Sequence, residues 1–368
     1  MSEFKLTTVE EFEAATARLL ETGAKVGADS WQMRVKNQTP HCKFGEQGVC
    51  CRICAMGPCR ITPKAPRGIC GCDVHGIVGR NFLRFTAGGA ATHSDHGREI
   101  CITLGHAKEG GDYQVKDPEK LIRIAKEWGV ETEGKDIYDL AHEMSDLAQE
   151  EYGKIRGVSR WLKRAPQHTQ DLWHEAEIEP RAIDREVSCA LHMTHMGNTS
   201  KPEALIRQAL RNGLSDGWGG SMCGTEFSDV LFGTPKPIET EANLGVMNAE
   251  NVNIVVHGHD PSLSEMICEY ADSKEMIDYA KSMGAKGITV SGVCCTSNEV
   301  AMRRGIPMAG NFLQQENVVL TGACEAIVVD VQCIFPALGP LSKCFHTKFI
   351  TTSPICQMPD SDFIRFNA

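Results

Sequence analysis

The pattern of hydrophobic and polar positions divides the chain into a part with helical periodicity and a part with short apolar runs. Residues 4–238 are predicted to be mainly helices and loops. One helix is clearly delimited, because Asp117 is a suitable N-cap, Pro118 occupies the first helical position and Gly129 follows the last periodic residue. Further helices are predicted over residues 136–152 and 202–212, and the glycine-rich stretch 217–224 is predicted to be a loop.

After about Asn243 short apolar runs alternate with helical segments. Strands are predicted over residues 253–256, 287–290, 326–331 and 349–351, and helices over residues 261–283 and 297–304. Such alternation is typical of βαβ units and a parallel sheet. We therefore predict an α + α/β fold class, with an N-terminal helical domain over residues 1–240 and a Rossmann-like parallel-sheet domain over residues 241–368.

The last predicted strand lies close to Ala368, and no helix follows that could cover it. A parallel sheet is covered on both faces. The expectation from the sequence is therefore that the sheet domain is incomplete and that the polypeptide is truncated or split.

Composition narrows the range of partners. The chain is 42% hydrophobic and 23% charged, as in ordinary soluble proteins. General nucleic-acid binding requires a positively charged protein surface, and this chain has a net charge of -10. Nucleic acid is therefore excluded as a partner. Neither a signal peptide nor an apolar run of membrane-spanning length is found, which predicts a cytoplasmic protein that does not bind membranes.

Cysteine usage points to metal. The chain has 17 cysteines, and disulfides are rare in reducing compartments. Four of them form the pattern C-x2-C-x4-C-x10-C, namely Cys51, Cys54, Cys59 and Cys70. Four thiolates in so short a segment favour a [4Fe-4S] cluster. Zinc is the alternative, because C-x2-C is also its commonest half-site.

Cys42 and Cys50 lie immediately upstream of this pattern. Two thiolates cannot complete a cubane cluster, but a two-fold axis supplies the same two ligands from a second copy. This predicts a homodimer that shares an iron-sulfur cluster. The alternatives are a pair of buried thiols, or Cys72 and Cys101 as the other two ligands.

Chemically reactive side chains also follow the predicted strands. His259 follows the first strand, Cys294 and Cys295 follow the second, and Cys333 follows the third. The carboxyl ends of parallel strands meet at one edge, so these residues should gather in one crevice. Imidazole and thiolate ligands suit iron, nickel or zinc. Taken singly, each of these residues is compatible with a packed core position.

A third candidate set is the series His93, His96 and Glu99, spaced three residues apart. On a helix these side chains would form a ladder along one face, suited to passing protons between a buried site and solvent. The spacing alone favours the alternative, a solvated polar helix face.

Four motifs together resemble anaerobic nickel-iron carbon monoxide dehydrogenases, and the closest type is the subunit found with acetyl-CoA synthase in acetogenic bacteria. The motifs are CKFGEQGVCCRICAMGPCRITPKAPRGICG (42–71), NLGVMNAENVNIVVHGHDP (243–261), SGVCCTSNE (291–299) and VVDVQCIFP (328–336). The resemblance runs over nearly the whole chain. Hybrid-cluster proteins share the fold, but neither the paired cysteine arrangement nor the CC after the second strand.

The resemblance implies a role for each candidate residue. Cys42 and Cys50 match ligands of the cluster at the dimer axis, and Cys51, Cys54, Cys59 and Cys70 match those of a [4Fe-4S] relay cluster. In the [Ni-4Fe-4S] active cluster, His259 and Cys295 match ligands of the outlying iron and Cys333 matches a ligand of the iron-sulfur portion. Cys294 matches a cysteine connected with metal loading, and His93 and His96 match the proton ladder.

The implied reaction is the reversible conversion of CO and water to CO2, two electrons and two protons. The implied partners are ferredoxin, the acetyl-CoA synthase subunit and the remainder of the catalytic subunit. That remainder would carry the missing active-cluster ligands beyond Ala368. Glu99 and Ile102 depart from the histidines common in relatives, which leaves the proton route open. The alternatives are an electron-transfer or scaffolding subunit without its own active cluster, and a hybrid-cluster type reductase.

Overall fold

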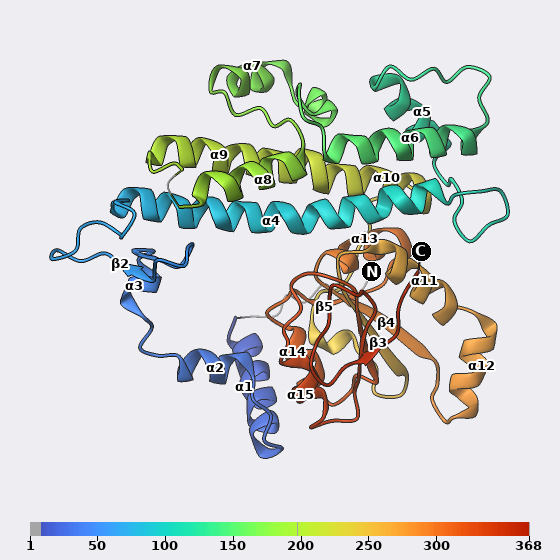
Figure 1. Cartoon of the computed structure of the whole chain (residues 1–368). Helices are drawn as coiled ribbons and strands as arrows, with labels where there is room; N and C mark the ends of the chain where they lie inside the picture. The colour runs from blue at the N-terminus through green and yellow to red at the C-terminus, as the bar shows by residue number, and fades with distance from the viewer. Residues whose placement is uncertain (1–8, 197, 368) are drawn as a thin grey trace. The chain divides into compact units, whose positions relative to one another are not determined.

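The computed structural model describes residues 9–196 and 198–367, which belong to two units (Figure 1). Pro40–Thr234 form the helical unit, and residues up to Thr39 join Pro235 onward in the sheet unit. A single boundary near residue 240 does not describe this division, since the segment before Pro40 packs within the sheet unit. The backbone N–H of Trp31 donates to Glu316 at 2.6 Å, and its indole N–H donates to the carbonyl of Leu313 at 2.8 Å.

The helical unit is organised around one long helix, α4 (Val74–Gly105), with α6, α8, α9 and α10 lying along it (Figure 1). Its core includes the buried residues Ile100, Leu104, Leu121 and Phe227. The remaining elements are α3 (Lys43–Glu46), β1 (Cys50–Cys51), β2 (Cys59–Arg60), α5 (Pro118–Glu127), α6 (Ile137–Tyr152), η1 (Arg160–Arg164), α7 (Gln167–Glu175), α8 (Ile183–Thr194), α9 (Pro202–Leu214), η2 (Ser215–Ser221) and α10 (Met222–Phe232).

The helix predicted from its cap at Asp117 and the helix predicted over residues 136–152 are both confirmed. The carboxylate of Asp117 accepts the backbone N–H of Lys120 at 2.9 Å, and α5 begins at the next residue, Pro118. Asp136 caps α6 in the same way, accepting the N–H of Tyr138 at 2.8 Å. These caps satisfy N–H groups that the first helical turn leaves unpaired.

The loop predicted over residues 217–224 is wrong, because this stretch is helical. The π-helical segment η2 continues from α9 and leads directly into α10. A side chain at Gly220 would place its Cβ only 2.8 Å from the carbonyl oxygen of His93 on α4. Glycine is therefore needed here for close helix packing and not for a turn.

The sheet unit contains a six-stranded parallel sheet in the order β5-β4-β3-β6-β7-β8, which is the doubly wound Rossmann order. Its elements are α1 (Val9–Lys25), α2 (Trp31–Asn37), η3 (Leu244–Val246), β3 (Val252–Gly258), α11 (Pro261–Ala271), α12 (Lys274–Ser282), β4 (Ile288–Val293), α13 (Cys294–Arg304), β5 (Met308–Gly310), α14 (Gln315–Leu320), β6 (Ala326–Val329), α15 (Leu338–Ser342), β7 (Lys348–Thr351) and β8 (Asp362–Phe363). The predicted combination of helices and a parallel sheet is confirmed.

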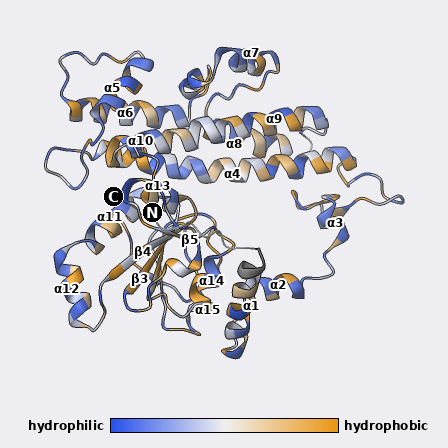
Figure 2. Cartoon of the chain, turned by 180° about the vertical axis from the view of Figure 1, so that it is seen from behind, coloured by the Kyte–Doolittle hydropathy of each residue, from blue (hydrophilic) through white to orange (hydrophobic). Residues whose placement is uncertain are grey.

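Both faces of the sheet are covered, as the alternation along β3 shows. Val255 packs into a cluster with residues of α14 and α15, whereas its neighbour Val256 packs against Cys268 of α11 and Val300 of α13. Figure 2 shows the corresponding hydrophobic colour on β3 and β4. Successive side chains of a strand point to opposite faces, so two adjacent buried valines indicate that both faces of the sheet are buried.

Three predictions for this unit need correction. The single helix over residues 261–283 is two helices, because Ser273 accepts the N–H of Met276 at 3.3 Å and caps a new one. The helix expected to start at residue 297 begins at Cys294, directly after β4. The strand at 349–351 is not the last strand of the sheet, since β8 pairs with it and places Phe363 opposite Thr351.

Among the described residues, none of the helices has the length and apolar composition that a membrane span requires.

Candidate metal centre

The cysteine loop of the helical unit is a short hairpin held on the long helix. Its strands β1 and β2 pair antiparallel and place Cys51 opposite Cys59. The side-chain amide of Asn81, on α4, donates to the carbonyl oxygens of Gly48 and Cys50, each at 2.9 Å. The hairpin is therefore fixed by a side chain that is itself part of a long, packed helix.

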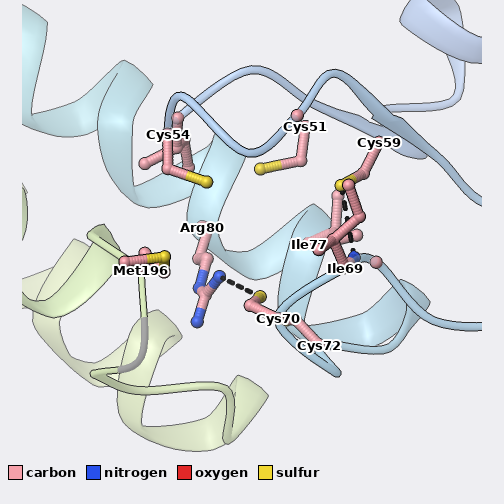
Figure 3. A pocket seen from close by; sticks show the side chains of 12 residues that line it. Cys51, Cys54, Cys59, Ile69, Cys70, Cys72, Ile77, Arg80 and Met196 are labelled. Atoms are coloured by element: carbon pink, nitrogen blue, oxygen red, sulfur yellow. Dashed lines mark hydrogen bonds between the residues drawn. The ribbon is translucent and has the colours of Figure 1, made fainter.

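The four cysteines of the C-x2-C-x4-C-x10-C pattern line one pocket. Figure 3 shows the sulfurs of Cys51, Cys54, Cys59 and Cys70 directed toward the same space. Cys72, Ile77, Arg80 and Met196 also line this pocket. The loop thus brings together all four predicted ligands and adds a fifth thiol.

Hydrogen bonds within the pocket favour thiolate sulfur. The backbone N–H of Ile69 donates to Cys59 Sγ at 3.4 Å, and the buried guanidinium of Arg80 lies 3.8 Å from Cys70 Sγ. The pKa of Cys70 is lowered, first by the backbone N–H of Cys72 and then by Arg80. Burial raises the pKa of the Cys72 thiol instead. A set of cysteine sulfurs with N–H donors directed at two of them fits an iron-sulfur cluster, whose properties depend on such hydrogen bonds.

Among residues 9–196 and 198–367, no three His, Cys, Asp or Glu side chains converge closely enough to hold one metal ion in common.

Cys42 and Cys50 lie outside the pocket. Cys42 is exposed and Cys50 half-buried. Backbone N–H groups of Gly45 and Phe44, at the start of α3, lower the pKa of Cys42. The alternative in which Cys72 and Cys101 complete this pair gains no support, because Cys72 lines the pocket of the other four and Cys101 lies in the helical core. There its sulfur is 3.4 Å from that of Cys223.

The residues that follow strands β3, β4 and β6 lie at the carboxyl edge of the sheet. Strands β4, β3 and β6 are neighbours, and Gly258 at the end of β3 forms a bridge with Cys294. Burial raises the pKa of Cys294 to about 12, and the nearby thiols of Cys333 and Cys295 add to the shift. The order of strands reverses between β3 and β6, which is where ligands bind in open α/β sheets.

A buried carboxylate fixes the backbone at His259. Asp330, at the end of β6, accepts the N–H of His259 at 2.6 Å and also the N–H of Val331. Burial, followed by the charge of Asp260, raises the pKa of Asp330 well above its usual range. A side chain at Gly258, where φ is +135°, would place its Cβ only 1.9 Å from Asp330 Oδ1. Glycine is thus required for the carboxylate to reach the chain.

The backbone at this edge is strained. Cys294, Gln332 and Cys333 have φ angles of 67°, 72° and 59°, a region that residues with a side chain rarely adopt. Such conformations persist only where surrounding contacts enforce them, and they are common at functional sites. His259 is 4% exposed, whereas Cys295 and Cys333 are exposed thiols.

The histidine series lies on α4 in the helical unit. His96 is 6% exposed, which rules out a fully solvated helix face, and Glu99 is exposed. The Nδ1 atom of His93 lies 2.5 Å from the carboxylate of Asp216 in η2. Asp216 was missed from the sequence, because it belongs to no motif and lies 123 positions from His93 along the chain.

Comparison with known proteins decides the family. Residues 49–368 match the family model described as "Prismane/CO dehydrogenase family". The chain belongs to this family. It is 47% identical to carbon monoxide dehydrogenase 1 of Methanosarcina mazei over 360 residues, covering 96% of this chain and 57% of that protein.

Two further relatives agree with this assignment to the Prismane/CO dehydrogenase family. The beta subunit of carbon monoxide dehydrogenase/acetyl-CoA synthase from Moorella thermoacetica is 41% identical, with 89% of this chain and 50% of that protein covered. A Ni-free crystal structure of carbon monoxide dehydrogenase from Thermococcus sp. AM4 superposes with a TM-score of 0.92 at 48% identity, covering 95% of this chain and 56% of that one. The chain therefore spans little more than half the length of these relatives.

Proposed function

We propose that this chain is part of a carbon monoxide dehydrogenase, which interconverts CO and water with CO2, two electrons and two protons at a nickel-iron-sulfur cluster. The observation that carries the proposal is the position of His259, Cys294, Cys295 and Cys333 after strands β3, β4 and β6, which flank the switch point of the sheet. When bound, such a cluster supplies Lewis acidity and a redox centre to the reaction. The family membership of the chain supports the same reaction.

At the sheet edge, we assign His259 and Cys295 to the outlying iron and Cys333 to the iron-sulfur portion of the active cluster. Cys294 is assigned to metal loading. The donor set supports this assignment, since imidazole and thiolate suit iron and nickel. Asp330 holds the backbone of His259 in place before any metal is bound.

In the helical unit, we assign Cys51, Cys54, Cys59 and Cys70 to a [4Fe-4S] relay cluster. Their shared pocket and the N–H groups directed at Cys59 and Cys70 support this role. Cys42 and Cys50 are assigned to a cluster shared with a second copy of the chain. We further propose ferredoxin as electron acceptor, the acetyl-CoA synthase subunit as a partner and the cytoplasm as the location.

His93 and His96 are proposed to move protons. Asp216 accepts from Nδ1 of His93, and this hydrogen bond assigns the exchange of a proton to Nε2, the other ring nitrogen. The hydrogen bond also holds the ring in one orientation. His96, being buried, is protected from direct exchange with bulk water.

The variant Asp216→Asn tests this role. We expect kcat for CO oxidation to fall about tenfold, because the amide no longer fixes the tautomer and orientation of the His93 ring. Nickel and iron contents should not change. The matched control is Asp95→Asn, since Asp95 lies on α4 and pairs with Arg98 at 3.1 Å. Equal turnover in the two variants would contradict the role of Asp216.

The function itself is tested on the native polypeptide, isolated anaerobically with nickel present. We expect CO-dependent reduction of a viologen dye and about one nickel per active cluster. Iron and sulfide without nickel, together with no response to CO, would instead support an electron-transfer or scaffolding subunit. A colourless protein without sulfide would contradict both.

A further inference from the structure

The side chain of Gln315 lies at the centre of a buried hydrogen-bond network in the sheet unit. Gln315 is the first residue of α14 and is fully buried. Its amide nitrogen donates to the carbonyl oxygens of Phe312 at 2.6 Å and Cys333 at 2.9 Å. Its amide oxygen accepts the backbone N–H of Phe335 at 2.8 Å and lies 3.1 Å from Nε2 of His257.

These partners leave only one orientation for the amide. Two backbone carbonyls can only accept, so the amide nitrogen must face them, and the N–H of Phe335 can only donate to the oxygen. The contact with His257 therefore requires a hydrogen on Nε2 of the ring. All the polar atoms of the Gln315 side chain are used, which gives the group a single defined position.

This network spans the two elements that carry the proposed ligands. On one side, Gln315 binds the backbone at Cys333 and again two residues later, at Phe335. On the other side, it binds His257 on β3, two residues before His259. The backbone at Cys333 is left-handed, with φ of 59°, and such a conformation needs external contacts to persist.

We propose that Gln315 is a positioning residue that fixes the Cys333 thiolate relative to His259 for metal binding. This inference rests on the proposed function. Gln315 touches neither metal nor substrate, and it acts through the backbone of Cys333 and the ring of His257. Residues of this kind, which orient metal ligands, typically change metal affinity by about 10–100-fold when they are replaced.

Two variants of the native protein test the proposal. Gln315→Met is similar in size and removes all four hydrogen bonds, whereas Gln315→Glu keeps an oxygen for Phe335 and His257. The matched control is Gln357→Met, because Gln357 is exposed and makes a local bond to the carbonyl of Pro354 at 3.1 Å. Circular dichroism establishes that each variant is folded.

Two readouts are measured, and one of them requires no metal. In the metal-free chain, the rate of Cys333 alkylation is compared with that of Cys295. We expect this ratio to change about fivefold or more in Gln315→Met, less in Gln315→Glu and not in the control. In protein isolated with nickel, we expect about a tenfold loss of nickel in Gln315→Met, while the iron of the relay cluster is retained.

The outcomes separate the inference from the function on which it rests. An unchanged alkylation ratio with full nickel content in Gln315→Met would overturn the inference. So would unfolding of both variants, since Gln315 would then serve the fold in general. A changed ratio in a protein whose wild type binds no nickel would contradict the proposed function and leave the positioning of Cys333 by Gln315 supported.

Discussion

Replacing Cys70 with alanine should remove about four iron atoms per chain, whereas replacing Cys72 in the same way should leave the iron content unchanged. The two cysteines are separated by one residue and line the same pocket. The pKa values of the two thiols are shifted in opposite directions, because hydrogen bonds lower the pKa of Cys70 and burial raises that of Cys72. Only the thiolate is a metal ligand.

Iron and sulfide analysis of anaerobically purified protein measures this difference, together with the electron paramagnetic resonance signal of the reduced cluster. Cys72→Ala is the matched control, since it removes a sulfur from the same pocket. Full iron content in Cys70→Ala would contradict the assignment of this ligand. Equal loss in both variants would show that the pocket depends on packing and not on a particular sulfur.

The second large effect is expected from Gly258→Ala, which should destabilise the sheet unit and abolish nickel binding. The strained φ of +135° costs a residue with a side chain about 1–3 kcal/mol. The new methyl group would also meet the carboxylate of Asp330, and such overpacking costs about 1–3 kcal/mol more. Asp330 would have to move, and it would release the N–H of His259.

Gly284→Ala is the control for this variant. Gly284 has a φ of +100°, but no heavy atom lies within 4 Å of a Cβ built there. Alanine at position 284 would therefore introduce the backbone strain without a steric contact. Urea unfolding should show Gly258→Ala to be less stable than Gly284→Ala by at least about 1 kcal/mol. Equal stability, with equal nickel content, would mean that the close approach of Asp330 has no role.

The sequence predicted those features of the molecule that depend on neighbours along the chain. Asp117 was recognised because a helix cap is a local hydrogen bond. The strand ends were recognised because parallel strands share one carboxyl edge, so that His259 and Cys333 could be placed together without knowing any contact between them.

Other features depend on contacts between distant segments, and the sequence pattern does not reveal them. Asp216 and Gln315 are polar residues without a motif, and their partners lie on other elements. The glycines of η2 were taken for a loop, because glycine serves both turns and close helix packing. Ser273 divides a continuous amphipathic pattern, and nothing in the periodicity distinguishes that serine from one on a helix surface.

The strand order of the sheet also bears on which of the proposed metal sites can form first during synthesis. The thiols of the relay pocket come from one short segment, so a small loop closure suffices to bring them together. The proposed ligands at the switch point follow strands β3, β4 and β6, and these strands can pair only after the intervening chain has been synthesised. If the proposed sites hold metal, the first pocket could therefore form earlier in synthesis than the site at the sheet edge.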